Sequence, residues 1–280
     1  MQLLGAIAAP ATLLTALLFY FGWVRTNSFF QEFGVEASVL RLTPPDYLLR
    51  SVDGLYVPLG IVLVAGVLAV WGHLWVATAL DREPLPRLLA AETSGVGLVV
   101  FGAGVAGVLD PRLADVYPFL LPVCLAVGAG LTAYGRWIWQ RAQATRRPGR
   151  PTPPRSVSAA GAVLVALLVV LALFWAANDF AGAVGRGRAA ATLRALDERP
   201  GVVLYSAERL FLQGPGVREQ SLPDDPHGRY RYRYEGLRLL IESDERLVLL
   251  PAGWTPEAGP AFVVAQDEAL RVEFRPGTPG

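Results

Sequence analysis

The sequence predicts a membrane α-helical bundle followed by a small, mostly β C-terminal domain with a barrel- or sandwich-like fold. The chain of 280 residues is 53% hydrophobic and only 18% charged, and its mean hydropathy is +0.39. Soluble domains carry about a quarter charged residues, so much of this apolar surface is expected to face lipid. Long apolar runs fill the first two thirds of the chain, and alternating strand-like patterns fill the remainder.

Five apolar runs are long enough to cross the roughly 30 Å hydrocarbon core of a bilayer as helices. They cover residues 3–24, 55–80, 88–109, 116–134 and 159–177, and together they predict a transmembrane domain over residues 1–177. The first run is expected to be retained, because no basic residue precedes Arg25 and aromatic residues mark its end. The third run is rich in glycine, so it is expected to need neighbouring helices.

Small residues recur four positions apart in the third and fourth runs, where they would let helix backbones approach closely. The pairs are Gly102/Ala106, Ala103/Gly107, Ala126/Gly130 and Ala129/Ala133. They predict helix packing within the chain or a homo-oligomer. The alternative is that they reflect only a high overall frequency of alanine and glycine.

Arginine counts in the short loops predict the orientation. The loop 135–158 holds six arginines among several prolines, and with the 81–87 loop it brings the count on one side to eight, against four in the opposite loops. The more basic side is expected to be cytoplasmic. With five spans, the N-terminus then lies inside and the C-terminal domain outside the cell membrane.

Three segments outside the spans complete the predicted organisation. The outer loop 25–54 contains apolar clusters that are expected to lie along the membrane surface, and within it Thr43 and Pro44 indicate a helix start. Residues 178–200 predict a helical connector. Residues 201–280 alternate in the manner of strands and predict an extracytoplasmic β-domain.

The strands of this domain are expected over residues 202–206, 209–213, 229–242, 246–250, 261–266 and 269–274. One face of each strand must be buried, and the residues that alternate with polar positions are the candidate core. They are Val248, Leu250, Phe262, Val264, Leu270, Val272 and Phe274.

A row of three arginines is the first candidate site. Arg229, Arg231 and Arg233 alternate with tyrosines, so a strand would place the guanidinium groups on one face and the phenol rings on the other. Such a row can bind an anionic head group, an envelope polymer or an acidic partner. The structural alternative is a half-buried strand with a solvated arginine face.

His73 and Glu92 are the second candidate, because an ionisable group within an apolar span is a default hypothesis for an intramembrane polar site. Packing at the membrane interface is the alternative, since His73 lies between Trp71 and Trp75. Neither metal-ligand spacing nor a catalytic constellation is found, and Cys124 is the single cysteine. No cofactor and no enzymatic activity are therefore predicted.

These observations favour a non-enzymatic anchor, scaffold or sensor that presents a β binding domain outside the membrane. Its expected partners are the lipid bilayer, another membrane or envelope protein, or a second copy of the chain; the charge balance argues against nucleic acid. An oligomeric small channel or transporter subunit is the alternative.

Overall fold

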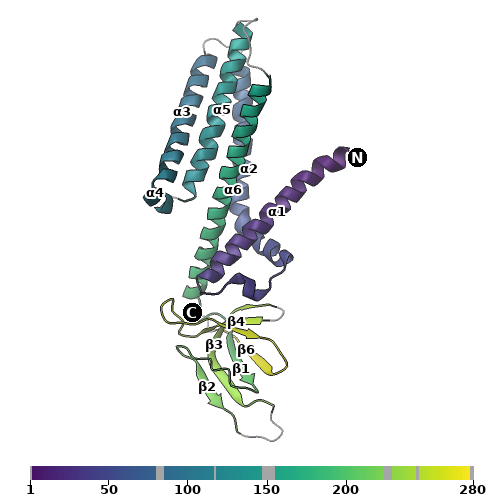
Figure 1. Cartoon of the computed structure of the whole chain (residues 1–280), viewed down its shortest axis with the longest axis vertical. Helices are drawn as coiled ribbons and strands as arrows, with labels where there is room; N and C mark the ends of the chain where they lie inside the picture. Colours follow the sequence, from purple (N-terminus) through teal and green to yellow (C-terminus); the bar gives the residue numbers. More distant parts are fainter. Residues whose placement is uncertain are drawn as a thin grey trace. The chain divides into compact units, whose positions relative to one another are not determined.

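The computed structural model describes residues 2–79, 85–116, 118–146, 155–223, 229–243 and 246–277 (Figure 1). The helices are α1 (Gln2–Gln31), η1 (Ala37–Leu40), α2 (Pro44–Ala79), α3 (Leu85–Leu109), α4 (Pro111–Val116), α5 (Leu120–Arg146) and α6 (Arg155–Arg194). The strands are β1 (Gly201–Ser206), β2 (Arg218–Ser221), β3 (Tyr232–Glu242), β4 (Arg246–Pro251), β5 (Phe262–Ala265) and β6 (Leu270–Arg275). A helical part followed by an antiparallel β-sheet agrees with the predicted order.

The chain forms two compact units. One unit joins residues 1–53 to residues 181–280, and the other comprises residues 54–180. The predicted division at residues 177 and 200 stays a prediction, but the packing groups the first 53 residues with the β-sheet. Each unit is therefore described by itself.

Four helical segments in the described part of the chain are long and apolar enough to cross a membrane. They are Gly54–Thr78, Leu88–Leu109, Leu120–Gln143 and Ala159–Arg194. The helix that holds the fourth predicted run begins at Leu120, later than expected, and Val116 belongs to the short helix α4. The predicted connector is continuous with the last run in α6, a helix of 40 residues. The helix α1 covers the first predicted run but is not among the four, so its crossing stays a prediction.

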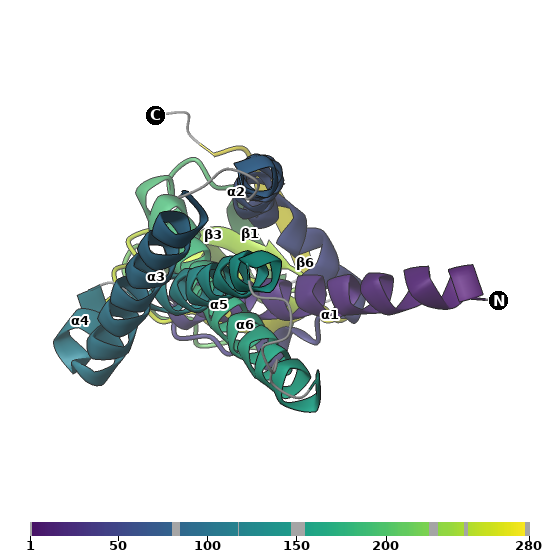
Figure 2. The ribbon, with the colours of Figure 1, turned by 90° about the horizontal axis from the view of Figure 1, so that it is seen from above.

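In the unit of residues 54–180, α3 and α5 lie side by side as an antiparallel pair (Figure 2). Their backbones meet at glycines spaced by seven residues: Gly97 and Gly104 on α3, Gly128 and Gly135 on α5. A Cβ atom at Gly97 would lie 2.5 Å from the backbone nitrogen of Thr132, and one at Gly128 would overlap the backbone of Phe101. A side chain does not fit at Gly97, Gly128 or Gly135 without a shift of the facing helix, whereas a Cβ atom at Gly104 would lie 3.1 Å from its nearest neighbour.

Only some of the small residues named from the sequence pack between α3 and α5. Gly107 contacts Leu121, and Ala126 and Ala129 are buried. Gly102 and Gly130, in contrast, face open space. A spacing of seven keeps residues on one face of paired helices better than a spacing of four, which explains the difference.

The start of α2 follows the predicted capping pattern. The hydroxyl and the backbone N–H of Thr43 each donate a hydrogen bond of 2.7 Å to a carboxylate oxygen of Asp46. These bonds hold the carboxylate at the positive end of the helix dipole, and they lower the pKa of Asp46 below its usual value.

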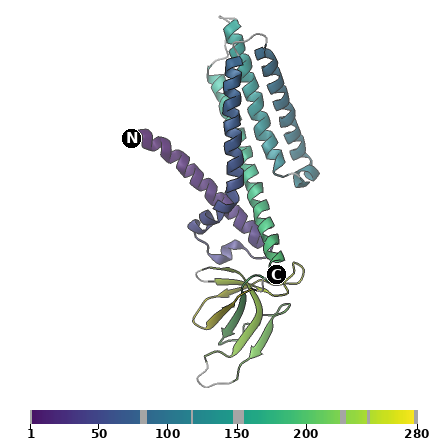
Figure 3. The ribbon, with the colours of Figure 1, turned by 180° about the vertical axis from the view of Figure 1, so that it is seen from behind.

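The β-sheet has the strand order β5-β4-β3-β1-β6, and β2 pairs with β3 beside this path (Figure 3). Every pairing is antiparallel. On one edge, β3 pairs first with β2 and then with β4, and Gly236 lies at the change with a φ of +79°. A side chain there would overlap the carbonyl oxygen of Gly216, so glycine allows the strand to turn from one partner to the next.

Two strand predictions were wrong. Residues 209–213 form no strand, because Phe211 adopts a left-handed φ of +53°. The strand β2 was missed, because all four of its residues are exposed and carry no apolar alternation.

Both faces of β4 are buried, each in a separate core. Leu247 and Leu249 pack in a core formed within the sheet, together with Tyr234. Val248 and Leu250 face a second core, to which the end of α1, η1 and the end of α6 contribute. The members from outside the sheet are Phe30, Phe33, Val35, Ala37, Leu40, Ala189, Leu196 and, after β4, Trp254.

The predicted core residues mostly agree with these two clusters. Val248, Leu250 and Val264 are buried, while Phe262, Leu270 and Val272 pack against the core within the sheet. Phe274 is 49% exposed, so its assignment to the core was wrong. The outer loop also differs from expectation, because its apolar residues are buried against the sheet and do not simply lie along a membrane surface.

Candidate functional site

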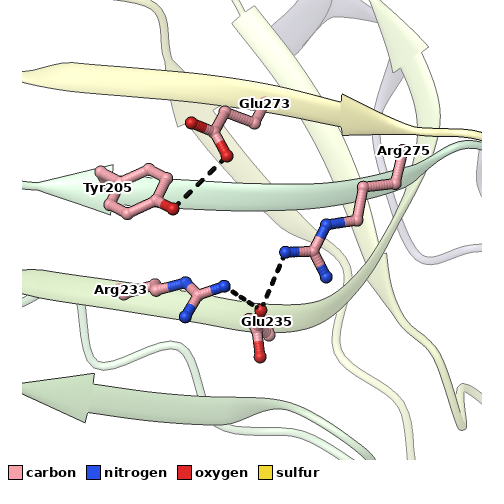
Figure 4. Close-up of polar contacts among 5 residues, drawn as sticks. All are labelled: Tyr205, Arg233, Glu235, Glu273 and Arg275. Carbon is pink, nitrogen blue, oxygen red and sulfur yellow. Dashed lines mark hydrogen bonds and ion pairs between the residues drawn. The ribbon is translucent and has the colours of Figure 1, made fainter.

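The predicted arginine row is divided between a turn and a strand. Only Arg233 lies in β3, whereas Arg229 and Arg231 precede it and are exposed. Arg233 forms an ion pair with Glu235, whose carboxylate also lies 3.2 Å from Arg275, as Figure 4 shows. Arg229 lies 3.6 Å from Glu268. Two of the three guanidinium groups thus lie near carboxylates, one in β3 and one in the turn between β5 and β6.

The tyrosines between these arginines do not all share one face. Tyr234 is fully buried, and its hydroxyl accepts a 2.7 Å hydrogen bond from the backbone N–H of Leu210. Tyr230 lies outside the strand and contacts the ring of Tyr205, next to which Arg233 also lies. The alternation of tyrosine and arginine between two faces therefore begins only with β3, at Tyr232, and does not include the residues before it.

The described contacts of His73 are with aromatic residues of α5. Nδ1 of His73, on α2, lies 2.9 Å from the hydroxyl of Tyr134, and its ring contacts Trp137 on α5. Glu92 is exposed on α3. No contact between them is described, so a joint site of His73 and Glu92 stays a prediction, while His73 belongs to an aromatic cluster with Tyr134 and Trp137.

A cavity that the sequence did not predict has a volume of about 590 Å³. It lies within the unit of residues 1–53 and 181–280, where the end of α1, the start of α2, the end of α6 and β3 meet. Its described lining residues include four arginines, two threonines and no carboxylate: Arg25, Thr26, Phe29, Leu49, Arg50, Gly185, Arg188, Ala191, Thr192, Arg199, Leu240 and Ile241. This composition distinguishes it from the outer face of the sheet, where arginines alternate with glutamates.

Close contact between α1 and α2 forms one wall of this arginine cavity. A Cβ atom at Gly22 would overlap the carbonyl oxygen of Tyr47 and lie 3.3 Å from Cβ of Ser51. Ser51 is fully buried, and its hydroxyl donates a 2.7 Å hydrogen bond to the carbonyl oxygen of Leu48. This packing holds Arg25 and Arg50, each one helical turn beyond Gly22 or Tyr47, at the cavity.

A second close contact joins α1 to α6. A Cβ atom at Gly185 would overlap the carbonyl oxygen of Arg25 and lie 2.9 Å from Cβ of Ser28. Arg188 follows Gly185 by one helical turn and therefore points toward the same cavity. Three arginines from three helices are thus brought together by two contacts that only glycine permits.

The turn after α6 contributes the fourth arginine. Arg199 donates a 3.2 Å hydrogen bond to the hydroxyl of Thr192, which is 7% exposed. The carbonyl oxygen of Arg199 accepts a 3.0 Å hydrogen bond from Arg238 on β3. The sheet therefore fixes the turn that carries this guanidinium group.

Arginines are the only charged residues among the described lining residues of the cavity. Arg25 is 5% exposed, and burial lowers the pKa of Arg50 from its usual value, because the charged form is desolvated. Asp46, one turn before Arg50, offsets part of the positive charge. Guanidinium groups match phosphate and carboxylate with paired N–H donors, and the threonine hydroxyls can add further hydrogen bonds.

Searches among protein-family models, curated proteins and solved structures found no match to the chain. The arginine cavity escaped the sequence analysis because its residues come from four separate segments of the chain. The only local signal was that Gly22 and Gly185 each precede an arginine by three residues.

Proposed function

We propose that the chain is a non-enzymatic, multi-pass membrane protein that binds an anionic ligand in the arginine cavity. It would act as an anchor, scaffold or sensor that presents its β-sheet outside the cell membrane. The observation that carries the proposal is the convergence of four arginines on one cavity whose described lining holds no carboxylate. Its volume of about 590 Å³ is within the range of small-molecule sites.

The pairing of residues 1–53 with residues 181–280 supports the topology in this proposal. Four apolar helical segments separate the two parts of that unit in the sequence. An even number of crossings returns the chain to the side on which it began, so both parts can share one side of the membrane. The arginine imbalance across the loops favours the outside for that side.

The loop 135–158 would then be cytoplasmic. The helix α5 extends to Arg146 and α6 begins at Arg155, so the helices themselves carry part of its basic charge. Residues 147–154, with the remaining arginines of this loop, lie outside the described residues.

A binding experiment tests the anion site directly. The probe is inorganic pyrophosphate, added to the full chain in a neutral detergent while thermal unfolding is followed. A ligand at one hundred times its Kd stabilises the folded state by about 2.7 kcal/mol, so the unfolding midpoint should rise. The variant Arg188→Gln should lose most of this rise.

The matched control is Arg231→Gln, which changes an exposed arginine outside the cavity and should leave the stabilisation intact. Stabilisation that is absent from the unmodified chain would refute the proposal. Equal loss in both variants would show that the effect depends on overall charge and not on the cavity.

Thiol labelling tests the orientation. In a Cys124→Ala background, a cysteine introduced by Ser221→Cys should react with an impermeant reagent in intact cells, whereas Thr145→Cys should react only after the membrane is opened. The reverse pattern would show that the β-sheet lies in the cytoplasm.

A further inference from the structure

The strand β6 forms one edge of the β-sheet. It is last in the order β5-β4-β3-β1-β6, so among the described strands it pairs only with β1. The backbone N–H of Ala207 donates a 3.3 Å hydrogen bond to the carbonyl oxygen of Ala269, so the backbone groups of Ala269 point toward β1. Because this direction alternates along an antiparallel strand, the backbone groups of Val272 and Phe274 point away from the sheet. A further strand can pair with such an edge.

The side chains of β6 alternate between apolar and charged. Leu270 and Val272 pack against the core within the sheet, whereas Phe274 on the same face is 49% exposed. Arg271 and Glu273 lie on the other face, where they form an ion pair of 2.8 Å and both stay partly exposed. The edge therefore offers an uncovered apolar side chain on one face and two opposite charges on the other.

We propose that β6 pairs with β6 of a second copy of the chain, in antiparallel orientation about a two-fold axis at Val272. In this register Arg271 lies opposite Glu273 of the second copy, and by symmetry Glu273 lies opposite Arg271. Phe274 lies opposite Leu270 of the second copy, which covers its exposed ring. The strand is thus complementary to itself in charge and in apolar contact, and the proposal does not depend on the arginine cavity.

Backbone direction and charge select this register among those with an axis near the middle of β6. An axis at Val272 lets this residue exchange two hydrogen bonds with its counterpart, because its backbone groups point outward. An axis at Arg271 would place two guanidinium groups opposite each other, and one at Glu273 would do the same with two carboxylates. An axis at Phe274 would place Val272 opposite Pro276, which has no N–H to donate.

Disulfide cross-linking of the full chain in neutral detergent can capture this pair, which is expected to be weak because the interface is small. In a Cys124→Ala background, Val272→Cys places two thiols on residues whose Cα atoms are about 5.5 Å apart in the proposed pairing, a separation that a disulfide can bridge. Under mild oxidation this variant should form a covalent dimer about ten times faster than Val263→Cys. Val263 is the matched control, because it is a 37% exposed valine on β5, the opposite edge strand, which carries no charge.

Reversal of single charges tests the register. Arg271→Glu and Glu273→Arg each replace both pairs of opposite charge by pairs of like charge, so each should slow cross-linking through Val272→Cys about ten- to a hundredfold. An equal mixture of the two variants should recover most of the rate, because opposite charges face each other again in the mixed dimer. A purely structural role of either side chain would not give this recovery. The matched control Glu257→Arg, in an exposed turn between β4 and β5, should leave the rate unchanged.

Three outcomes would overturn the inference. Equal rates for Val272→Cys and Val263→Cys would show that the copies meet only by random collision. Cross-linking that the charge variants leave unchanged, or that their mixture does not recover, would refute the register. A chain that stays monomeric while Val272→Cys becomes linked to a different protein in cells would identify that protein as the occupant of the edge.

Discussion

Phe33→Ala should weaken the packing between the β-sheet and the N-terminal segment that covers it. Phe33 lies in the segment between α1 and η1, is 3% exposed, and contacts the rings of Phe29 and Trp254 at centroid distances of 5.2 and 5.4 Å. Its side chain belongs to the core that also holds Val248 and Leu250 of β4. The substitution therefore leaves a cavity between the N-terminal segment and the sheet.

The expected cost is about 3–5 kcal/mol, the usual range for a buried phenylalanine replaced by alanine. The two ring contacts account for part of this value, at about 0.5–1.5 kcal/mol for each aromatic pair beyond its buried area. Because about 1.4 kcal/mol corresponds to a factor of ten, opening of the core should become about a hundred to a few thousand times more frequent.

Thiol labelling can measure this opening without unfolding the long apolar helices. In a Cys124→Ala background, Val248→Cys places a small apolar thiol at a position that is 0% exposed. When closing is faster than labelling, the rate of modification by a maleimide follows the population of the open state. The rate should rise by the factor given above when Phe33→Ala is added.

The matched control is Phe211→Ala, since Phe211 is 63% exposed and lies over the guanidinium group of Arg209. It should change the labelling rate by less than about tenfold. If Phe33→Ala changes the rate no more than this control, the N-terminal segment does not complete the core of the sheet.

Three further predictions concern single contacts. Gly97→Ala should destabilise the α3·α5 pair by about 1–3 kcal/mol, because the new Cβ would lie 2.5 Å from a facing backbone nitrogen. Gly102→Ala is the control and should not lower the unfolding midpoint, because no atom lies within 4 Å of its new Cβ. Tyr234→Phe should cost about 1–3 kcal/mol in the same labelling assay, because the partly buried N–H of Leu210 loses its acceptor; an unchanged rate would mean that water replaces the hydroxyl. The pKa of Asp46 is lowered mainly by the hydroxyl of its capping threonine. The contribution of Asp46 to the free energy of unfolding is therefore complete above its ordinary pKa of 3.8. This contribution is lost as the pH falls through the lower pKa of the folded state. Unfolding midpoints between pH 2 and pH 5 should show this loss in the unmodified chain and not in Asp46→Asn.

Local sequence patterns predicted the local structure well. Apolar length located the long helices, and the spacing of Thr43, Pro44 and Asp46 gave the start of α2. In each case the conformation is decided by residues within a few positions of one another in the sequence. The predicted core positions Val248 and Leu250 succeeded for the same reason, since they alternate within one strand.

Contacts between distant segments were not visible in the sequence. Leu247 and Leu249 are buried as well, because β4 has a core on each face, and alternation alone assigns only one face to a core. The strand β2 has no apolar residue to mark it and is held by pairing with β3. The arginine cavity depends on the contacts at Gly22 and Gly185, which become evident only when the helices are placed together.

The joining of both chain ends in one unit sets an order for biosynthesis. Leu40 and Leu240 pack in the same core although 200 residues separate them in the sequence. At synthesis rates of about 5–20 residues per second, the first segment must wait roughly 10–40 seconds for its partner. During that interval Phe30, Phe33 and Leu40 have no sheet to cover them. Until the last strands emerge, these apolar side chains of the nascent protein must therefore be covered by something other than the sheet.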